Sequence, residues 1–407
     1  MSSFTMQLPR DVRYIITALN RSGYRADVVG GAVRDALLGK TPSDFDITTN
    51  ARPNEIKAVF ENEKTVDSGI SHGTVALILN GSQYEITTYR IDGEYKDNRH
   101  PVSVSFSNDI LNDLARRDFT VNALAYNDKD GLTDAFCGER DLREGVIRAV
   151  GEPALRFSED ALRILRAIRF AAVLGFDIEE ATSLALEEKM AGLDSVSVER
   201  ITVEWYKLLS GESSLGILEK YRNIIFRILP ELSDLKLPKE KAWRGRSASE
   251  REIMLFALNS DAAGFEAAKK RLKSDRRSLK FGSSVLKIME KLPVRTNDEL
   301  SRIIAANQDN ETICALSLAA ALEVESYETY ESFKSLTETG FPTKVSMLDV
   351  SGDDILRLGF RGEQVGKVLS ELLMLVLNRR CDNTRNKLIS AVKLIKKQGK
   401  FPISNAN

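Results

Sequence analysis

The spacing of apolar and polar residues changes along this chain at about residue 140. Up to that point, short runs rich in β-branched and aromatic residues predict five strands, over residues 27–30, 45–49, 74–79, 84–89 and 123–126. Gly81-Ser82, between the third and fourth runs, predicts a hairpin turn and therefore an antiparallel pair. The pattern thus predicts a mixed sheet and excludes a Rossmann domain.

From Glu159 onward the pattern is helical almost without interruption. Helices are predicted over residues 159–174, 181–190, 201–209 and 215–229, and over long stretches after Arg251. A chain of 407 residues is long enough for two or more folding units. The predicted fold class is α+β, a mixed-sheet head followed by an elongated all-α neck, body and tail, divided into residues 1–140, 141–200, 201–300 and 301–407.

The composition is that of a globular protein in a reducing compartment. Apolar residues make up 43% of the chain and charged residues 29%. No apolar run approaches the ~20 residues that span a bilayer, and the first residues lack the apolar core of a signal peptide. Cys137, Cys314 and Cys381 are too few and too far apart for a disulfide framework or a zinc cluster. We therefore expect a cytoplasmic protein without a membrane or a stable protein partner.

Only two histidines occur, His72 and His100. This count excludes an appended phosphohydrolase that binds metal through several His and Asp residues. It also argues against a histidine as general base, so any acid–base or metal chemistry is expected from carboxylates.

Positive charge is concentrated locally although the net charge is only −1. Residues 268–280 carry seven Lys/Arg against one Asp, and residues 379–400 carry eight against one. In the second segment, Leu388, Val392 and Ile395 recur at helical spacing, which predicts an amphipathic helix with one basic face. Such a helix suits a polyanionic partner, whereas the first segment is equally compatible with an ordinary solvated helix face.

The most informative chemistry lies in Gly30-Gly31-Ala32-Val33-Arg34-Asp35 and in the following Asp44-Phe45-Asp46. Two carboxylates at i and i+2 on a strand point to the same face. There Asp44 and Asp46 can hold a pair of divalent ions about 4 Å apart, as used for in-line attack at phosphorus. The glycines let the backbone approach a triphosphate, and Arg34 supplies donors for its oxygens. Either piece alone is also compatible with an ordinary turn, but together they predict a nucleotidyltransferase.

Two further segments add candidates to this site. Glu85 becomes a third carboxylate near the metals if the hairpin places its strand beside that of Asp46; an exposed strand residue is the alternative. In the segment Arg116-Arg117-Asp118-Phe119-Thr120-Val121-Asn122, Arg117 can clamp phosphate, and Asp118 can accept a hydrogen bond from a ribose hydroxyl.

The segment 157–170 carries a row of charges on an otherwise apolar helix. Ser158 is the expected N-cap, and Asp160, Arg163, Arg166 and Arg169 recur every third residue. Charges within a buried helix are costly unless each is paired or faces a ligand. Snorkelling arginines are the alternative, but Asp160 at the head of the row favours a ligand.

Asp160 and Arg163 together form a hydrogen-bond template. The carboxylate only accepts and the guanidinium only donates. Cytosine and adenine each present an amino donor beside a ring-nitrogen acceptor, whereas uracil and guanine present the reverse. Buried mismatches discriminate steeply. The pair therefore predicts an enzyme that selects CTP and ATP without a nucleic-acid template.

These motifs resemble those of the class II tRNA nucleotidyltransferases, the CCA-adding enzymes, and of the related bacterial poly(A) polymerases. The resemblance runs in order from Gly30 to about Gly175, through GGAVRD with DFD, YEITTYR, the loop 92–101, RRDFTVNAL, DLREGVIR and EDALRILRAIRF. Residues 197–201 continue it, and residues 353–373 look like the tail of bacterial members.

The resemblance implies a polymerase-β-like catalytic head and a role for each motif. Asp44 and Asp46 would hold two Mg²⁺ ions, and Gly31 and Arg34 would meet the nucleotide. The remaining implied roles are phosphate and ribose contacts for Arg117 and Asp118, base reading for Asp160 and Arg163, and phosphate or stacking contacts for Arg166 and Arg169. The tRNA 3′-hydroxyl would attack the α-phosphorus while the later helices hold the acceptor arm.

Three other activities stay open at this stage. The loop 92–101, whose loss marks CC-adding members of the family, is intact here, which favours full CCA addition. Addition of A alone and poly(A) synthesis share the same motifs. A catalytically silent tRNA-binding protein is the alternative from another class, and intact Asp44 and Asp46 argue against it.

Overall fold

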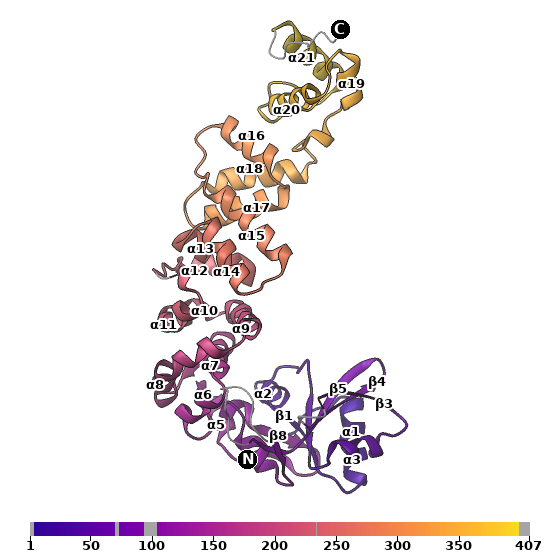
Figure 1. Ribbon diagram of the computed structural model, residues 1–407, viewed down its shortest axis with the longest axis vertical. Coiled ribbons are helices and arrows are strands. Elements are labelled where there is room, and N and C mark those ends of the chain that lie inside the picture. The colour runs from indigo at the N-terminus through magenta and orange to yellow at the C-terminus, as the bar shows by residue number, and fades with distance from the viewer. Residues whose placement is uncertain (1–3, 70–72, 93–103, 233, 399–407) are drawn as a thin grey trace. The chain divides into compact units, whose positions relative to one another are not determined.

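The computed structural model describes residues 4–69, 73–92, 104–232 and 234–398. Its contacts divide the chain into two units, Met1–Pro230 and Glu231–Asn407. The first unit contains the sheet and the helices around it, and the second is helical throughout its described residues (Figure 1). The predicted division into four parts stays a prediction.

The first unit is built on a seven-stranded mixed sheet in the order β3-β4-β5-β2-β1-β8-β9. Only β2 and β5 pair in parallel; the other neighbours are antiparallel. The strands are β1 (Ala26–Val29), β2 (Asp46–Thr49), β3 (Lys64–Gly69), β4 (Thr74–Leu79), β5 (Ser82–Thr88), β8 (Leu124–Asn127) and β9 (Gly131–Asp134). The predicted mixed sheet is confirmed.

The predicted hairpin between the third and fourth strands is also confirmed, one residue earlier than expected. Leu79 pairs with Ser82, so Asn80 and Gly81 form the turn, both with positive φ. Asn-Gly is the sequence most suited to such a two-residue turn because both residues tolerate the left-handed conformation. The hairpin places β5 where it can pair with β2, the strand that begins at Asp46.

Sequence patterns missed four strand pairings. β3 and β9 lie at the two edges of the main sheet, where one-sided packing gives little apolar alternation. Two small sheets were also missed. They are formed by β6 (Arg90–Asp92) with β7 (Val104–Phe106), and by β10 (Val146–Ile147) with β11 (Asp177–Ile178).

Short helices and the first long helix cover the sheet. α1 and α3 contact each other and the sheet, while α2 lies against β1 and β8. Behind β1, a small core contains Val29, Tyr89, Ile110 and Leu114. The helices are α1 (Arg10–Arg21), α2 (Gly31–Leu37), α3 (Pro53–Val59) and α4 (Ile110–Ala115), with the 3₁₀ turn η2 (Thr120–Asn122).

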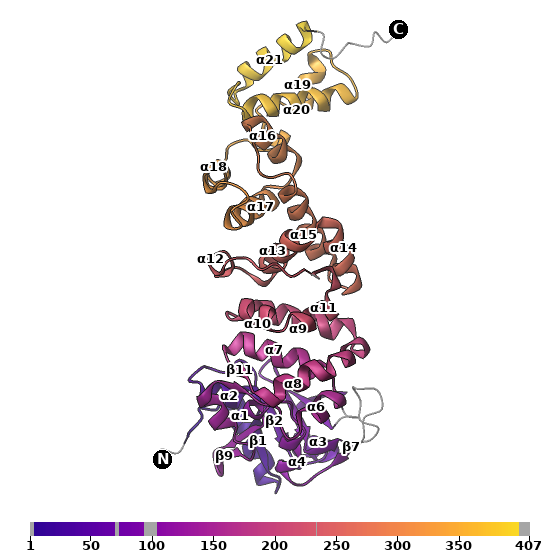
Figure 2. The same cartoon turned by 90° about the vertical axis from the view of Figure 1, so that its left-hand side faces the viewer.

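A layer of helices completes the first unit, and α7 lies between β10–β11 and the later helices α9 and α10 (Figure 2). The predicted helix over 215–229 is broken at Tyr221 into two. The elements are α5 (Gly138–Glu144), α6 (Pro153–Glu159), α7 (Leu162–Leu174), α8 (Glu180–Lys189), η3 (Met190–Ser195), α9 (Val198–Ser210), α10 (Ser214–Lys220) and α11 (Arg222–Ile228).

The second unit consists of helices joined by short turns. Its elements are η4 (Pro230–Leu232, which starts at the boundary), α12 (Glu240–Trp243), α13 (Ala248–Asn259), α14 (Ala262–Arg271), α15 (Arg276–Met289), α16 (Asn297–Ala306), α17 (Asp309–Ala321), α18 (Tyr327–Glu338), η5 (Val345–Met347), α19 (Gly352–Arg357), α20 (Glu363–Leu377) and α21 (Arg385–Lys397). No helix within the described ranges is long and apolar enough to cross a membrane.

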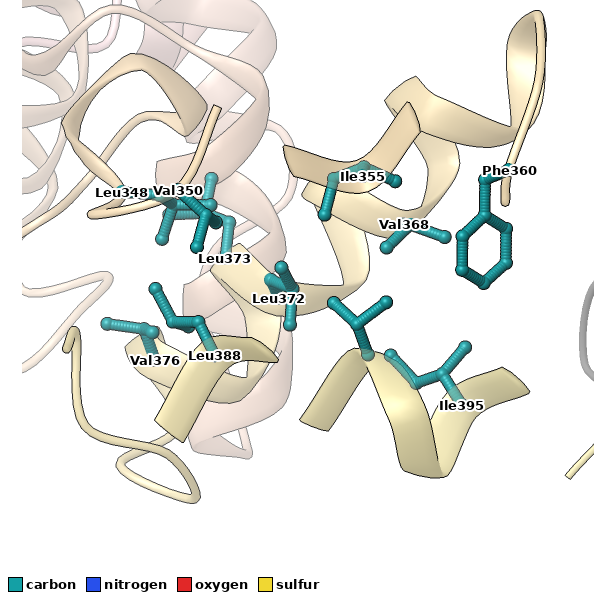
Figure 3. Packing of buried hydrophobic residues seen from close by; sticks show 11 residues of the cluster. Leu348, Val350, Ile355, Phe360, Val368, Leu372, Leu373, Val376, Leu388 and Ile395 are labelled. Atoms are coloured by element: carbon teal, nitrogen blue, oxygen red, sulfur yellow. The ribbon is translucent and has the colours of Figure 1, made fainter. Parts of the chain in front are cut away.

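The end of the second unit has a core of its own. α19, α20 and α21 enclose a cluster that includes Leu372, Leu388, Val392 and Ile395 (Figure 3). The last three residues are those that predicted an amphipathic helix, and that prediction is confirmed. The opposite side of α21 exposes Lys387, Lys393 and Lys397 among other residues.

Candidate active site

An open pocket at the start of β2 contains the acidic pair. The cavity has a volume of about 690 Å³ and is lined by Asp44, Asp46 and Glu85, together with residues from the loop before β2 and from β5. Asp46 is the first residue of β2, and Asp44 precedes it in the loop. Both carboxylates line one pocket, as predicted, although only Asp46 lies on the strand, so the alternation of strand side chains does not account for the position of Asp44.

The electrostatics of this pair suit a bound cation. Loss of contact with water raises the pKa of Asp46 above its usual value, the Asp44 carboxylate raises it further, and Arg117 lowers it. Although Asp46 is exposed as a whole residue, protein groups surround its carboxylate closely enough to produce this effect. Two carboxylate oxygen donors in an open pocket fit a hard divalent ion such as Mg²⁺, whose charge would relieve the repulsion between them.

Glu85 lines the pocket on the neighbouring strand. β2 and β5 pair in parallel with Ile47 opposite Ile86, so Asp46 and Glu85 occupy the preceding positions. Among the described residues, however, no three Asp, Glu, His or Cys side chains converge closely enough to form a metal site. The structure therefore brings Glu85 to the pocket wall but leaves its predicted catalytic role a prediction.

The glycine turn at Gly30 lies against the side chain of Arg117. Gly30 has φ 71° and ψ −125°, a conformation that favours glycine, and a Cβ there would lie 2.9 Å from Nη1 of Arg117. Arg117 also lies near enough to Asp46 to lower its pKa. The guanidinium thus lies against the glycine turn and acts electrostatically on Asp46, which are properties expected of a phosphate-binding group.

Arg34 is held on α2 just after this turn. Its Nε donates to Asp35 at 2.8 Å and its Nη1 donates to the side chain of Asn122 at 2.8 Å. A Cβ on Gly31 would lie 3.6 Å from Nη2 of Arg34, so Gly31 and Arg34 are close neighbours, as predicted. Asn122 lies in η2 and was not singled out by sequence reasoning, although it belongs to the RRDFTVN segment.

Asp118 is a buried partner of Arg166. Its Oδ1 accepts from the Phe119 amide and the Asn122 side chain, and its Oδ2 accepts from Arg166 Nε at 2.7 Å. Burial alone would raise the pKa of Asp118, but Arg166 and these hydrogen bonds lower it to about 2. The predicted ribose contact stays a prediction, because in this structure the carboxylate orders protein groups.

The helix predicted over 159–174 is confirmed from Leu162 to Leu174, but its predicted start is wrong. Pro153 starts the separate helix α6, which contains Ser158 and ends at Glu159; Asp160 is extended, and α7 begins at Leu162. Ser158 therefore does not cap the helix, and its hydroxyl donates to the Ala154 carbonyl instead. Pro is favoured at the first position of a helix, so Pro153 is the signal that the sequence reasoning overlooked.

Asp160 lies in the break between α6 and α7, and Arg163 lies at the start of α7. The two side chains bind different partners. Asp160 accepts from the Leu162 amide at 3.1 Å and from Arg200 Nη2 at 2.7 Å. Arg163 donates to Glu159 at 2.6 Å and, through Nη2, to the backbone carbonyl of Arg116 at 2.9 Å. Both side chains are thus held in place, and the carboxylate, with about four acceptor sites, retains capacity for a ligand.

Arg169 and Phe170 complete the charged face of α7. Arg169 forms an ion pair with buried Glu204 of α9, and burial lowers its pKa against the influence of that carboxylate. The guanidinium groups of Arg169, Arg34 and Arg166 lie 3.7, 5.3 and 5.4 Å from the centre of the Phe170 ring. A ring face attracts cations, so the Phe170 ring favours the positions of these three guanidinium groups.

Sequence reasoning did not assign roles to the partners of these groups. Each of these partners contacts a predicted site residue; they are Asp113, Asn122, Glu159, Phe170, Arg200 and Glu204. Most lie within or beside the recognised motifs. His72, His100 and nearly all of the loop 92–101 lie outside the described residues, so the expectation based on that loop is untested by the structure.

A mixed sheet with an acidic pair at the start of one strand, a glycine turn and converging arginines defines a nucleotidyltransferase. Residues 26–148 match the family described as Poly A polymerase head domain. Residues 175–235 match the family described as Probable RNA and SrmB-binding site of polymerase A.

Similar proteins extend the match to nearly the whole chain. The chain is 36% identical to the CCA-adding enzyme of Leuconostoc mesenteroides over 90% of its own length and 92% of the relative's. The Bacillus stearothermophilus CCA-adding enzyme in complex with CTP is similar in structure, with a TM-score of 0.80, 29% identity, and coverage of 97% of this chain and 99% of that one. The chain belongs to the family of CCA-adding enzymes.

Two further solved structures show the same fold with other ligands. A CCA-adding enzyme with ATP matches with a TM-score of 0.73 and 25% identity, covering 98% of this chain and 97% of that one. The Thermotoga maritima CCA-adding enzyme complexed with tRNA matches with a TM-score of 0.69 and 25% identity, covering 95% and 96%.

We expect the Asp118–Arg166 pair to make stability depend on pH. Because the folded pKa of Asp118 lies below the ordinary 3.8, ionisation stabilises the fold above pH 4, and this contribution is lost as pH falls toward 2. Asp118→Asn should therefore reduce the free energy of unfolding by roughly 2 kcal/mol or more at pH 7, and the difference from wild type should shrink toward pH 3. Urea unfolding between pH 7 and 3 measures it.

Asp128→Asn is the matched control, because Asp128 is an exposed carboxylate with two long contacts, to Arg13 at 3.4 Å and to the Tyr126 hydroxyl at 3.3 Å. Its difference from wild type should be small at every pH. A deficit of Asp118→Asn that stays constant down to pH 3 would contradict the assignment.

Proposed function

We propose that this chain, a CCA-adding tRNA nucleotidyltransferase, uses the pocket of Asp44 and Asp46 to add CCA to tRNA 3′ ends from CTP and ATP without a template. The observation that carries the proposal is the convergence of that acidic pair with Arg117 and the Gly30 turn. CTP, ATP and tRNA are the ligands named for the similar enzymes of known structure.

Asp44 and Asp46 are proposed to hold two Mg²⁺ ions, which would activate the attacking 3′-hydroxyl and neutralise the leaving pyrophosphate. Arg117 donates to the phosphate chain, while the glycine backbone at Gly31 and the fixed Arg34 guide its approach. Glu85 adds negative charge on the pocket wall. The bond between the tRNA 3′-oxygen and the α-phosphorus forms as the bond to pyrophosphate breaks.

Asp160 and Arg163 are proposed to read the base. The carboxylate accepts from the amino group of cytosine or adenine, and the guanidinium donates to the adjacent ring nitrogen. Arg166 and Arg169 contribute phosphate or stacking contacts, and Asp118 contacts ribose while it orders Arg166. Asp160 pairs with Arg200 and Arg163 pairs with Glu159, so each side chain is held by a neighbouring group, which supports the proposal.

The basic face of α21 is proposed to contact tRNA phosphates. The cytoplasm is the proposed location, since tRNA is the substrate and all three cysteines are free thiols. The similarity to CCA-adding enzymes over nearly the whole chain favours CCA addition over poly(A) synthesis and addition of A alone, which share the head, and over a non-catalytic tRNA-binding protein.

Nucleotide incorporation separates these functions. A tRNA that ends at the discriminator base should gain two C residues with CTP alone, and one further A when ATP is added, before extension stops. Gel analysis at single-nucleotide resolution measures this. A long A tract without CTP would indicate poly(A) synthesis, and extension only of tRNA that already ends in CC would indicate A addition.

Removal of the acidic pair should abolish chemistry but not tRNA binding. Asp44→Ala/Asp46→Ala should reduce incorporation by at least about 1,000-fold, because the proposed metal ligands are lost. Binding of tRNA, measured by filter retention, should change less than about twofold. Asp128→Ala is the control carboxylate outside the pocket. Substantial extension by the double variant would refute the metal assignment.

Removal of the base-reading carboxylate should relax base choice. Asp160→Ala should raise the ratio of UTP to CTP incorporation by roughly tenfold or more, because a mismatched carboxylate no longer opposes the uracil carbonyl. Competing nucleotides supplied at equal concentration measure the ratio. Asp177→Ala, which removes an exposed carboxylate on β11, should leave it unchanged. Full wild-type preference in Asp160→Ala would end the template hypothesis.

The basic face of α21 should contribute to the salt dependence of tRNA binding. Lys387→Ala/Lys393→Ala/Lys397→Ala should reduce the slope of log affinity against log salt by about 2, since each lost phosphate contact removes roughly 0.7. Lys367→Ala on α20 is the control, because Lys367 already pairs with Glu363. An unchanged slope in the triple variant would exclude this face from the interface.

A further inference from the structure

Asp113 is a fully buried carboxylate that no role above requires. It lies in α4, and its side chain has no exposed surface. Two consecutive arginines share it. Oδ1 accepts from Nε and Nη2 of Arg116 at 2.9 and 2.7 Å, and Oδ2 accepts from Nη2 of Arg117 at 3.3 Å. One carboxylate therefore pairs with two guanidinium groups, more tightly with Arg116 than with Arg117.

The oxygen that holds Arg117 also faces the strand of the acidic pair. The hydroxyl of Thr48, two residues after Asp46 on β2, lies 3.5 Å from Oδ2 of Asp113 and donates to the Thr87 carbonyl at 3.0 Å. Thr48 is itself buried. Asp113 thus lies beside the strand that carries Asp46, although the Thr48 hydroxyl donates its proton to the Thr87 carbonyl and not to Asp113.

The two terminal nitrogens of Arg117 have different surroundings, since one is hydrogen-bonded to Asp113 and the other lies beside Gly30. Its Nη2 bonds to Asp113, its Nη1 points at Gly30, and its buried Nε has no hydrogen-bond partner among the described residues. A buried donor without an acceptor leaves the guanidinium weakly held at Nε, so the hydrogen bond to Asp113 is an important restraint on it. That bond keeps Nη1 directed at the Gly30 turn.

We infer that Asp113 is a positioning residue of the nucleotidyl transfer reaction, which acts by holding Arg117 in register with the Gly30 turn and with Asp46. The inference rests on the phosphate-binding role proposed for Arg117. In addition, Asp113, which does not contact the nucleotide, sets the geometry of the contact between Arg117 and phosphate. A merely structural Asp113 would instead stabilise α4 and affect every step equally.

A double-mutant cycle distinguishes these two roles. Arg117→Ala should lower kcat/KM for CTP roughly 10- to 100-fold, the effect of losing a hydrogen bond from a charged group. Asp113→Asn should lower it roughly tenfold, mainly through a higher KM for CTP, while the KM for tRNA changes less than about twofold. In the Arg117→Ala background, Asp113→Asn should add less than about twofold, because its target is gone.

Asp141→Asn is the matched control, since Asp141 is equally buried and bonds to Arg148 and Thr120 but not to Arg117. Its effect should be the same in both backgrounds. If Asp113→Asn does not fold at the assay temperature, Asp113→Glu, which keeps the charge but displaces it, replaces it in the same cycle with the same expectation.

The outcomes separate the inference from the function on which it rests. Additive effects of the Asp113 and Arg117 substitutions, or an equal rise in the KM for tRNA, would overturn the positioning role alone. Wild-type kinetics in Arg117→Ala would overturn the proposed phosphate contact and the inference with it. A strongly non-additive cycle with an effect confined to CTP supports both.

Discussion

Buried guanidinium groups in the first unit need carboxylate partners, and this requirement organises the site. Transfer of an unpaired charge out of water is far more unfavourable than the net stability of a domain allows. In the structure, Asp118 forms an ion pair with Arg166, and Glu204 forms one with Arg169. The arginines are therefore oriented before any ligand arrives, which is the arrangement that electrostatic catalysis favours.

These pairs also connect segments that are distant in sequence. Asp118 follows α4 and fixes Arg166 of α7, while Arg163 of α7 donates to the carbonyl of Arg116. Asp160, at the break before α7, is fixed by Arg200 of α9. The segment that carries Arg116, Arg117 and Asp118 is thus bonded to α7 at two points, Arg163 and Arg166, so a change in that segment is expected to alter α7 as well.

Sequence patterns predicted much of this unit because its chemistry is local. The mixed sheet, the turn near Gly81 and the shared pocket of Asp44 and Asp46 follow from spacing alone. The break before α7 did not, because apolar and charged spacing continued smoothly across it. Only Pro153 marked the start of a separate helix.

The partners of the site residues were less predictable for a physical reason. Glu204 and Arg200 lie on α9, some forty residues after the side chains they bind, and nothing in periodicity shows which faces of two helices meet. Edge strands β3 and β9 were missed because one-sided packing weakens their pattern. Pairing across the fold is tertiary information, whereas residue type and local spacing are what the sequence displays.

A crystal structure with CTP and Mg²⁺ tests the central claim most directly. The account predicts metal density at Asp44 and Asp46, the triphosphate between Gly30 and Arg117, and cytosine facing Asp160 and Arg163, with the Asp118–Arg166 pair unchanged. A triphosphate bound away from Arg117, or metal at other carboxylates, would contradict the claim that these buried ion pairs hold a preformed nucleotide site.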